Sequence, residues 1–218
     1  MIAIIGGTGA LGGALAKRLA QKGTAIIIGS RDPAKAEAAA AEINAALGQD
    51  VAKGAGLAEA AAQATELCFV AVPFAAQSDT LAAIKANAQG KIVIDATVPL
   101  RPPRVGRVQL PESGSAVVDG AAILGEGVRV VSALQNIGAE KLATAEVIDA
   151  DVLVCGDDSD AVDQVCAFLG DIGLTCWNAG PLANSAAAEA MTSILIQINR
   201  RYKMIQGGFR ITGKRKEA

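Results

Sequence analysis

Three spaced glycines near the start of the chain, in the pattern Gly7-x-Gly9-x-x-Gly12, constrain its fold more than any other feature. Residues 1–5, just before them, form a short apolar run that suits a buried parallel strand. Residues 10–21, just after them, repeat their apolar positions at helical spacing. In this setting the first glycine allows a tight turn, the second lets the backbone approach a pyrophosphate, and the third lets the helix lie close to the sheet. The sequence therefore predicts a dinucleotide-binding loop.

Short apolar runs continue to alternate with helical patterns along the chain. Strands are predicted at residues 25–29, 51–53, 67–72, 91–94, 129–134, 152–155 and 174–177, and helices at 34–47, 57–64, 74–86, 160–169 and 182–201. Such alternation is typical of a parallel sheet with helices on both faces. We therefore expect a Rossmann-type, doubly wound α/β fold with a mainly parallel sheet in residues 1–180. Residues 181–218 are expected to add a small C-terminal helical lobe with a basic tail.

The composition excludes several classes of site. The chain has no histidine, which excludes a Ser-His-Asp or Cys-His catalytic apparatus and a His-ligated metal site, and we expect no metal. Aromatic residues make up 3% of the chain and the net charge is -2, so nucleic-acid binding is not expected. No apolar stretch predicts a membrane span, and the four cysteines include no Cys-x-x-Cys pair. We expect a cytoplasmic protein whose chemistry comes largely from a cofactor.

The residues after the second predicted strand indicate which dinucleotide binds. An enzyme for NAD usually has an acidic residue there, whereas this chain has Ser30 followed by Arg31. A hydroxyl and a guanidinium suit a 2′-phosphate, and Lys35, one helical turn further on, adds a second cation. Asp32 precedes Pro33, a pattern typical of a helix N-cap. The sequence therefore favours NADP over NAD.

The common sources of a catalytic proton on this fold are missing. A Tyr-x-x-x-Lys pair fails because Gln206 stands four residues after Tyr202, the single tyrosine. A Gly-x-x-x-Lys pattern fails because Asn184 stands four residues after Gly180. Without histidine as well, no strong proton donor for a ketone substrate is found. A flavin-like ring accepts hydride without an enzymic acid, so catalysis would reduce to holding two rings face to face.

Eight short motifs stand out along the chain. They are GGTGALG at 6–12, GSR at 29–31, VPF at 72–74, TVP at 97–99, VSAL at 131–134, VCGDD at 154–158, AGPL at 179–182 and NRRYK at 199–203. Together they resemble the NADPH-dependent reductases of coenzyme F420, an 8-hydroxy-5-deazaflavin, from residue 1 to about residue 213. The CGDD and NRRYK blocks are the most specific, since the first two motifs occur in many Rossmann proteins.

The resemblance implies reversible hydride transfer between nicotinamide C-4 and the deazaflavin ring, usually in a homodimer. NADP(H) would be the cofactor and coenzyme F420 the co-substrate. No residue would act as a catalytic acid or base, and Gln135 and Ile137 would lie near the acceptor ring as positioning residues. The implied cofactor-binding residues are Gly7, Thr8, Gly9, Ala10, Leu11 and Gly12 for the pyrophosphate loop, Ser30, Arg31 and Lys35 for the 2′-phosphate, Val72, Val98 and Ala139 for the nicotinamide side, and Gly208 for the deazaflavin.

Two positions depart from the family pattern. Gln135 stands where members of the family carry histidine near the acceptor ring, and Gly138 replaces a proline after Ile137. Glutamine can still donate a hydrogen bond, so hydride transfer survives the change. A pterin, a flavin or an imine therefore stays open as the acceptor, as does a non-catalytic NADPH-binding redox sensor.

Positive charge gathers at the end of the chain. Residues 199–218 hold seven basic side chains and one acidic one, whereas residues 1–198 hold 13 and 21. Four of the basic residues could receive the anionic tail of a small-molecule acceptor, although a solvated terminus is equally open, above all for residues 214–216; the four are Arg200, Arg201, Lys203 and Arg210. The loop at 99–111, with three arginines, could flank the acceptor or be a plain connection. We expect residues 181–218 to complete the acceptor site and the dimer interface.

Overall fold

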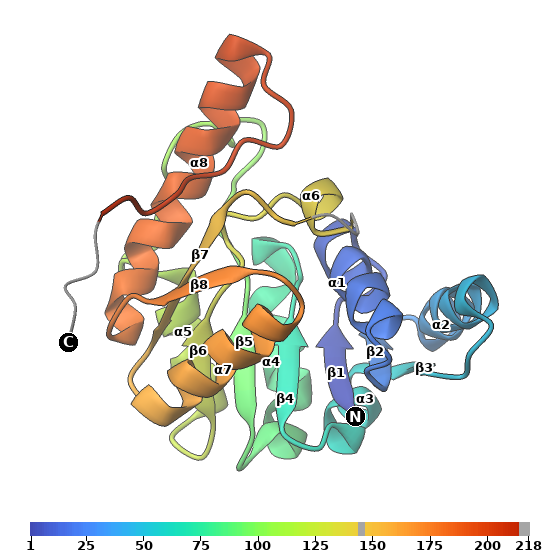
Figure 1. The fold of residues 1–218 in the computed structure, drawn as a ribbon. Helices are drawn as coiled ribbons and strands as arrows, with labels where there is room; N and C mark the ends of the chain where they lie inside the picture. The colour runs from blue at the N-terminus through green and yellow to red at the C-terminus, as the bar shows by residue number, and fades with distance from the viewer. Residues whose placement is uncertain (144–146, 214–218) are drawn as a thin grey trace, which may run out of the picture.

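The computed structural model describes residues 1–143 and 147–213, and its centre is one sheet (Figure 1). In this part of the chain the sheet has eight strands in the order β3-β2-β1-β4-β5-β6-β7-β8. All neighbouring strands are parallel except β6 and β7, which are antiparallel. The strands are β1 (Ile2–Ile5), β2 (Ile26–Ser30), β3 (Ala52–Gly56), β4 (Leu67–Val70), β5 (Ile92–Asp95), β6 (Arg129–Ser132), β7 (Asp151–Gly156) and β8 (Thr175–Asn178).

Helices cover both faces of this sheet. Side chains of α1, α2 and α7 join the hydrophobic cluster on one face, and those of α3, α4 and α5 join the cluster on the other. None of the helices in residues 1–143 and 147–213 is long and apolar enough to cross a membrane. The helices are α1 (Ala10–Gln21), α2 (Pro33–Leu47), α3 (Leu57–Gln63), α4 (Phe74–Ala88), α5 (Ala116–Leu124), α6 (Ala139–Ala143), α7 (Ser159–Asp171), the 3-10 turn η1 (Leu182–Asn184) and α8 (Ser185–Tyr202).

Strands β1 and β4 are apolar at every position because both of their faces are covered. Consecutive residues point to opposite faces, so Ile4 and Phe69 join one cluster while Ile5 and Val70 join the other. All four side chains are at most 1% exposed. The predicted doubly wound, mainly parallel α/β sheet is therefore confirmed.

The sequence pattern predicted neither α5 nor α6, and it did not predict that β7 runs antiparallel to β6. Helix α5 is capped by Ser115, whose hydroxyl accepts from the amides of Val117 and Val118, but it follows the proline-rich loop and was not predicted. Helix α6 has five residues, too few to show a helical period. The reversal between β6 and β7 is fixed by hydrogen bonds across the sheet, which the sequence pattern of a buried strand does not encode.

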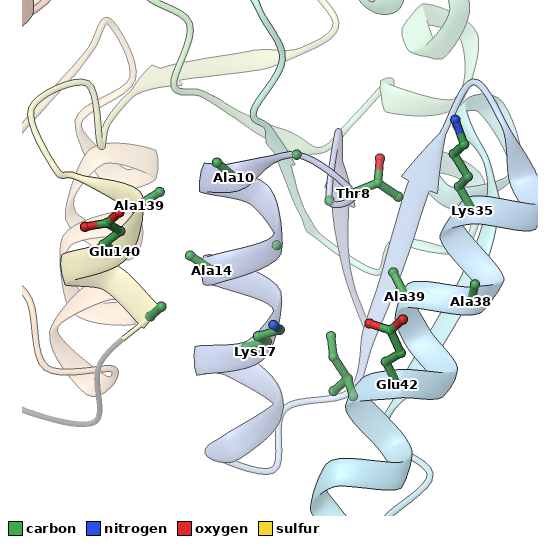
Figure 2. A pocket seen from close by; sticks show the side chains of 15 residues that line it. Thr8, Ala10, Ala14, Lys17, Lys35, Ala38, Ala39, Glu42, Ala139 and Glu140 are labelled. Atoms are coloured by element: carbon green, nitrogen blue, oxygen red, sulfur yellow. The ribbon is translucent and has the colours of Figure 1, made fainter.

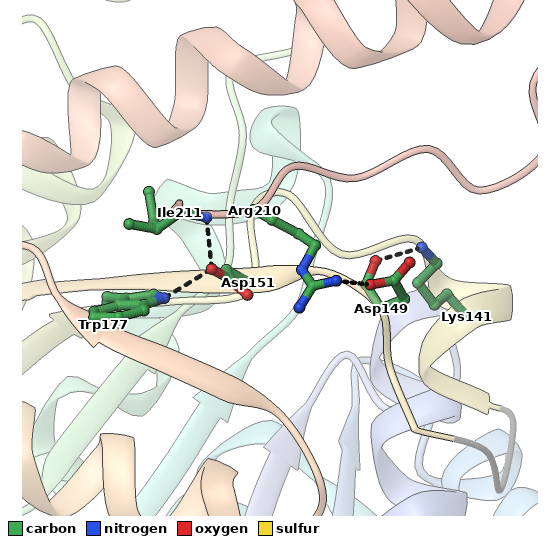
Figure 3. Close-up of polar contacts among 6 residues, drawn as sticks. All are labelled: Lys141, Asp149, Asp151, Trp177, Arg210 and Ile211. Atoms are coloured by element: carbon green, nitrogen blue, oxygen red, sulfur yellow. Dashed lines mark hydrogen bonds and ion pairs between the residues drawn. The ribbon is translucent and has the colours of Figure 1, made fainter. Parts of the chain in front are cut away.

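The C-terminal segment extends away from the sheet and then returns to it. Helix α8 rises beyond the carboxyl edge of the central strands, and the loop at 99–111 runs beside it (Figure 1). The tail then runs past the start of β7, where the amide of Asp151 donates to the carbonyl of Phe209 at 2.9 Å. The Asp151 carboxylate also accepts from the amide of Ile211 and the indole of Trp177 (Figure 3). Residues 214–216, predicted as a solvated end, lie outside the described residues.

Candidate dinucleotide and acceptor site

The glycine loop between β1 and α1 is too tight for side chains. Gly6 has a φ of 82° and so makes the left-handed turn, a role that the pattern had assigned to Gly7. A Cβ on Gly7 would lie 2.9 Å from Cγ2 of Ile28, so Gly7 is required by close packing on the sheet. A Cβ on Gly12 would lie 2.5 Å from the carbonyl oxygen of Gly6, which is the close approach of helix to strand predicted for the third glycine.

Helix α1 begins as an open anion site. Its N-cap is Gly9, with no side-chain cap and no acidic residue in the first turn. The first amides of a helix have no partner within the helix, and its dipole attracts negative charge there. The side chain of Leu11 packs against the core, so this residue offers its backbone alone to a ligand. The arrangement is compatible with the pyrophosphate role of residues 7–12, which stays a prediction.

A cavity of about 220 Å³ opens beside this loop at the carboxyl edge of β1, β2 and β4. The order of the sheet reverses between β1 and β4, which is where doubly wound proteins bind their ligands. The cavity brings together five predicted residues, Thr8, Gly9, Ser30, Arg31 and Val72. Sequence analysis missed other parts of its wall, which are Gly6, Leu57, Ala71, Pro73, Ala76 and Thr80.

A larger cleft of about 580 Å³ lies on the other side of the glycine loop, between α1, α2 and α6 (Figure 2). It shares Thr8 and Gly9 with the first cavity and contains Lys35 and Ala139 in its wall. Thr8 therefore borders both spaces, whereas Lys35 and Ala139 line the larger one without lining the smaller. The ionic side chains of this cleft also include Lys17, which the sequence did not single out.

The region after β2 has the predicted polar arrangement. The hydroxyl of Ser30 accepts from the amide of Asp32 at 3.1 Å, and Ser30 is 9% exposed. Asp32 is the N-cap of α2, and its carboxylate accepts from the amide of Lys35 at 3.4 Å, so the predicted capping role is confirmed. The other carboxylate oxygen of Asp32 lies 3.8 Å from Nζ of Lys35. The ammonium group partly offsets the negative charge of Asp32, which weakens its repulsion of a 2′-phosphate. Arg31 is exposed at the cavity.

Gln135 lies at the carboxyl end of β6 in a fixed orientation. Its Nε2 donates to the backbone carbonyl of Asp95 at 2.8 Å, and a carbonyl can only accept. The opposite amide orientation would set two oxygens against each other, so Oε1 must face away from Asp95. Oε1 is buried and has no hydrogen-bond partner among the described residues, in a side chain that is 5% exposed. The residue before it, Leu134, is left-handed with a φ of 73°.

Helix α8 holds this segment in place. The hydroxyl of Thr192 donates to the carbonyl of Gln135 at 2.8 Å, and the Asn136 side chain donates to the carbonyl of Ala188 at 2.8 Å. The side chain of Ile137 is 6% exposed and packs in the core, and its predicted place near the acceptor ring stays a prediction. Val98 follows β5 and is half-buried.

Two buried carboxyl groups near this end were not predicted as site residues. Asp95 ends β5 and is 1% exposed; it accepts from the Gln77 side chain at 2.6 Å and from the amide of Thr97 at 2.8 Å. Burial raises the pKa of Asp95, against these hydrogen bonds, which lower it. Glu189 of α8 accepts from the hydroxyl of Ser115 at 2.6 Å, and burial likewise raises its pKa. Neither carboxyl is exposed enough to protonate a substrate, so both act as structural groups.

Gly208 lies away from the other predicted residues. A Cβ on it would lie 2.6 Å from Cβ of Ala150 and 3.8 Å from Nζ of Lys141, beside the start of β7. The neighbouring Arg210 forms an ion pair of 2.9 Å with Asp149 (Figure 3). Neither cavity described above contains Gly208 in its wall. Its predicted contact with the acceptor stays a prediction.

Comparison with known proteins identifies the family. The chain is 39% identical to an F420-dependent NADP reductase of Methanothermobacter thermautotrophicus, over 97% of this chain and 94% of that protein. It is 36% identical to an F420-dependent NADP reductase of Methanocaldococcus jannaschii, over 97% of both chains. The chain belongs to the F420-dependent NADP reductase family. The family profile described as NADP oxidoreductase coenzyme F420-dependent matches residues 1–99.

One solved structure agrees with this F420-dependent NADP reductase assignment, and a second shares the fold. A protein of Arthrobacter sp. FB24, described as a candidate F420-dependent NADP-reductase, is 26% identical with a TM-score of 0.81, over 97% of this chain and 99% of that one. An imine reductase of Bacillus cereus BAG3X2 has a TM-score of 0.65 at 16% identity, over 93% of this chain and 61% of that one. At that identity the second likeness shows the fold alone.

The residues present fit NADP. Gly12 leaves no room for a Cβ against the backbone of Gly6, so helix α1 approaches the loop as dinucleotide binding requires. Arg31 supplies a permanent positive charge beside the smaller cavity, and the hydroxyl of Ser30 keeps its proton free to donate. Oε1 of Gln135 is a buried oxygen without a hydrogen-bond partner among the described residues, but Gln135 lines neither cavity.

Proposed function

We propose that this protein transfers hydride reversibly between NADPH and a deazaflavin acceptor of the coenzyme F420 type. The observation that carries the proposal is the cavity at the carboxyl edge of β1, β2 and β4, which brings the glycine loop together with Ser30 and Arg31 and has no acidic residue in its wall. The names of the curated relatives support the choice of acceptor. A pterin, flavin or imine acceptor has no comparable support here.

The proposed roles of the cofactor-binding residues follow the two cavities. The amides at the start of α1 would hold the pyrophosphate, and Ser30, Arg31 and Lys35 would surround the 2′-phosphate. When bound, the nicotinamide supplies the hydride. Val72, Val98 and Ala139 would exclude water from its ring, which favours hydride transfer over side reactions.

Gln135 would act by position. Its Oε1 would accept a hydrogen bond from an N–H group of a bound ring or carboxamide, which would satisfy the buried oxygen. Glutamine does not titrate, so this contact would be the same across the physiological pH range. A histidine at the same place would change charge near neutral pH. The family departure at this position would therefore leave the transfer independent of pH without preventing it.

An acceptor assay tests the proposal. The protein would be incubated with NADPH and, separately, with a deazaflavin, a flavin, a pterin and a cyclic imine, and the loss of acceptor absorbance or of NADPH would be followed. The deazaflavin should be turned over with the highest kcat/KM. Faster turnover of another acceptor would overturn the choice of acceptor, and tight NADPH binding without any turnover would point to a redox sensor.

We also propose a homodimer built on the C-terminal lobe of residues 181–213. Several large apolar side chains of this lobe are exposed in the single chain, at 49% for Ile194, 68% for Tyr202 and 84% for Ile205. Exposed apolar groups on one lobe favour contact with a second copy. Light scattering on the purified protein should give twice the mass of 21.9 kDa.

A cytoplasmic location is proposed from the state of the cysteines. All four are free thiols, and burial raises the pKa of Cys68 to about 12. Burial also raises the pKa of Cys176 to about 12, so neither thiol ionises readily. Free, unreactive thiols suit a reducing compartment. Fractionation of cells of the source organism, followed by detection of the protein, would test the location.

A further inference from the structure

Glu189 joins the first half of α8 to the start of α5, and both of its carboxylate oxygens take part. Oε2 accepts from the amide of Ala116 at 2.8 Å, and Oε1 accepts from the amide of Val117 at 3.2 Å. Oε1 also accepts from the hydroxyl of Ser115 at 2.6 Å. The side chain of Glu189 is 1% exposed, so breaking one of these contacts would leave a buried polar group without a partner. Both oxygens are therefore held at fixed places on the first turn of α5.

A second hydroxyl reinforces this junction of α5 and α8. Oγ of Ser185, at the start of α8, lies 2.7 Å from Oγ of Ser115, and the Ser185 hydroxyl also donates to the carbonyl of Leu182 at 2.6 Å. Both serines are at most 1% exposed. The contacts that the structure describes for Glu189 are with amides and a hydroxyl, and none of its described ion pairs involves this residue. The junction thus depends on the place of its oxygens and not on a pair of opposite charges.

The same part of α8 holds the segment of Gln135. Thr192 follows Glu189 by three positions, and residues three or four apart lie on one side of a helix. The hydroxyl of Thr192 donates to the carbonyl of Gln135 at 2.8 Å, and the side chain of Asn136 donates to the carbonyl of Ala188 at 2.8 Å. A shift of α8 at Glu189 would therefore move both contacts of the segment.

The side-chain amide of Gln135 leads back to α5 by another route. Its Nε2 donates to the carbonyl of Asp95 at 2.8 Å, and the Asp95 carboxylate accepts from Nε2 of Gln77 at 2.6 Å. Nε2 of Gln77 also donates to the carbonyl of Ala116 at 3.0 Å. Ala116 thus meets Glu189 with its N–H group and Gln77 with its C=O group. We name this closed ring of contacts, through α4, α5, α8 and the ends of β5 and β6, the hydrogen-bond circuit.

We infer that Glu189 is a positioning residue for the hydride acceptor, and that the length of its side chain, and not its charge, fixes the place of α8 and of Gln135. The inference rests on the proposed function, in which Gln135 contacts a bound ring. A contact in a closed ring of buried hydrogen bonds cannot lengthen without straining the others. Residues 6–12 and 29–35 take part in no contact of the circuit, so the effect should be confined to the acceptor and should spare NADPH.

Two variants separate length from charge. Glu189→Asp keeps the charge and shortens the side chain by one methylene, whereas Glu189→Gln keeps the length and removes the charge. In Glu189→Gln the amide oxygen can still accept from the amide of Ala116, and the amide nitrogen can donate to the hydroxyl oxygen of Ser115.

The KM values for the two substrates are the first readout. Glu189→Asp should raise the KM for the deazaflavin about tenfold, because a hydrogen bond to a charged group is lost, and leave the KM for NADPH unchanged. Glu189→Gln should keep both KM values within about twofold of the wild type. A variant that is only less stable would instead lose kcat at unchanged KM, because fewer molecules would be folded.

Asn44→Ala is the matched control. The side chain of Asn44 ties α2 to the edge strand β3 in a similar way: it accepts from the amides of Val51 and Ala52 at 3.0 and 2.9 Å and donates to the carbonyl of Ala52 at 2.8 Å. Asn44 lines neither cavity of the proposed site. The control should lower the free energy of unfolding and leave the KM for the deazaflavin within about twofold of the wild type. An equal rise in this KM for Asn44→Ala and Glu189→Asp would overturn the inference.

Hydrogen exchange followed by mass spectrometry tests the positioning without any turnover. Peptides that cover residues 132–138 should exchange faster in Glu189→Asp than in the wild type, Glu189→Gln or Asn44→Ala, because α8 holds this segment. If no deazaflavin is turned over, the proposed function is wrong, and the exchange at 132–138 alone decides the inference.

Three results would overturn the inference. They are equal effects of Glu189→Gln and Glu189→Asp, a rise in the KM for NADPH as large as that for the deazaflavin, and unchanged exchange at residues 132–138 in Glu189→Asp. If Glu189→Asp does not fold, Glu189→Gln decides: a KM for the deazaflavin within about twofold of the wild type supports the role of length, and a larger rise contradicts it.

Discussion

The two ends of the proposed site are built in different ways. The dinucleotide end is local: residues 6–12 and 29–35 supply the glycine loop, the helix start and the cations within about thirty residues. The acceptor end joins β5, β6, the loop at 99–111 and α8, which are spread over about a hundred residues. The first end is specified by tight packing, whereas the second is held by side-chain hydrogen bonds. The first should therefore tolerate substitution poorly and the second should be adjustable.

The largest effect is expected at Gly12. A methyl group in Gly12→Ala would lie 2.5 Å from the carbonyl oxygen of Gly6, so helix α1 would have to move away from the loop. We expect the free energy of unfolding to fall by about 2–3 kcal/mol. The Kd for NADPH should rise about 30-fold or more. Chemical denaturation and fluorescence titration measure the two quantities.

Gly170→Ala is the control for Gly12→Ala. Gly170 lies in the last turn of α7, and nothing comes within 4 Å of a Cβ built there. The control should be neutral or more stable by up to about 1 kcal/mol, with unchanged NADPH binding. Equal behaviour of the two variants would contradict the tight packing assigned to the dinucleotide end.

Arg31 tests the charge of the same end. Arg31→Ala should weaken NADPH binding about tenfold and leave NADH binding almost unchanged, because a charge-assisted contact to the 2′-phosphate is lost. Lys35→Ala should weaken NADPH binding only about twofold to threefold, because the side chain of Lys35 is 75% exposed and already forms an ion pair with Asp32. Equal losses for both dinucleotides would exclude the 2′-phosphate as the partner of Arg31.

Asp95 tests the buried hydrogen bonds of the acceptor end through the pH dependence of stability. Its pKa is raised by burial, so its contribution to stability is fully present below the ordinary carboxyl pKa and is lost as the pH rises through the raised value. The free energy of unfolding of the wild type should thus fall relative to that of Asp95→Asn as the pH rises from about 4. Parallel pH profiles would mean that Asp95 does not titrate differently in the folded state.

The smallest effect is expected at Gln135. Gln135→His should bring a pH dependence of about twofold to threefold into kcat/KM near pH 6.5, because histidine changes charge there, whereas the wild type should be flat. Gln135→Leu is the matched variant, which removes both the buried acceptor oxygen and the donor to the carbonyl of Asp95. It should raise the KM for the hydride acceptor without any pH dependence. A wild-type profile with a step near pH 6.5 would show a titrating group that the amide of Gln135 cannot supply.

The sequence by itself determined the parts whose cause is local. The glycine spacing fixed the loop, Asp32 before Pro33 fixed the start of α2, and the alternation of apolar runs with helical stretches fixed the doubly wound sheet. Gly6 was within reach of the same reasoning, because a glycine directly after a strand is a signal for a left-handed turn. The eight short motifs also indicate the family, and the identity of the whole chain to its relatives confirms it.

Only the tertiary structure decided how the acceptor end is assembled. It oriented the amide of Gln135 on the carbonyl of Asp95, buried the side chain of Ile137 in the core, paired Arg210 with Asp149 and brought the loop at 99–111 against α8. Each of these facts depends on a partner far away in the chain, and a local pattern does not identify such a partner. The role of the spaced glycines follows from steric limits within a few residues. Hydrogen bonds and ion pairs across the fold, in contrast, exist only after the elements have packed.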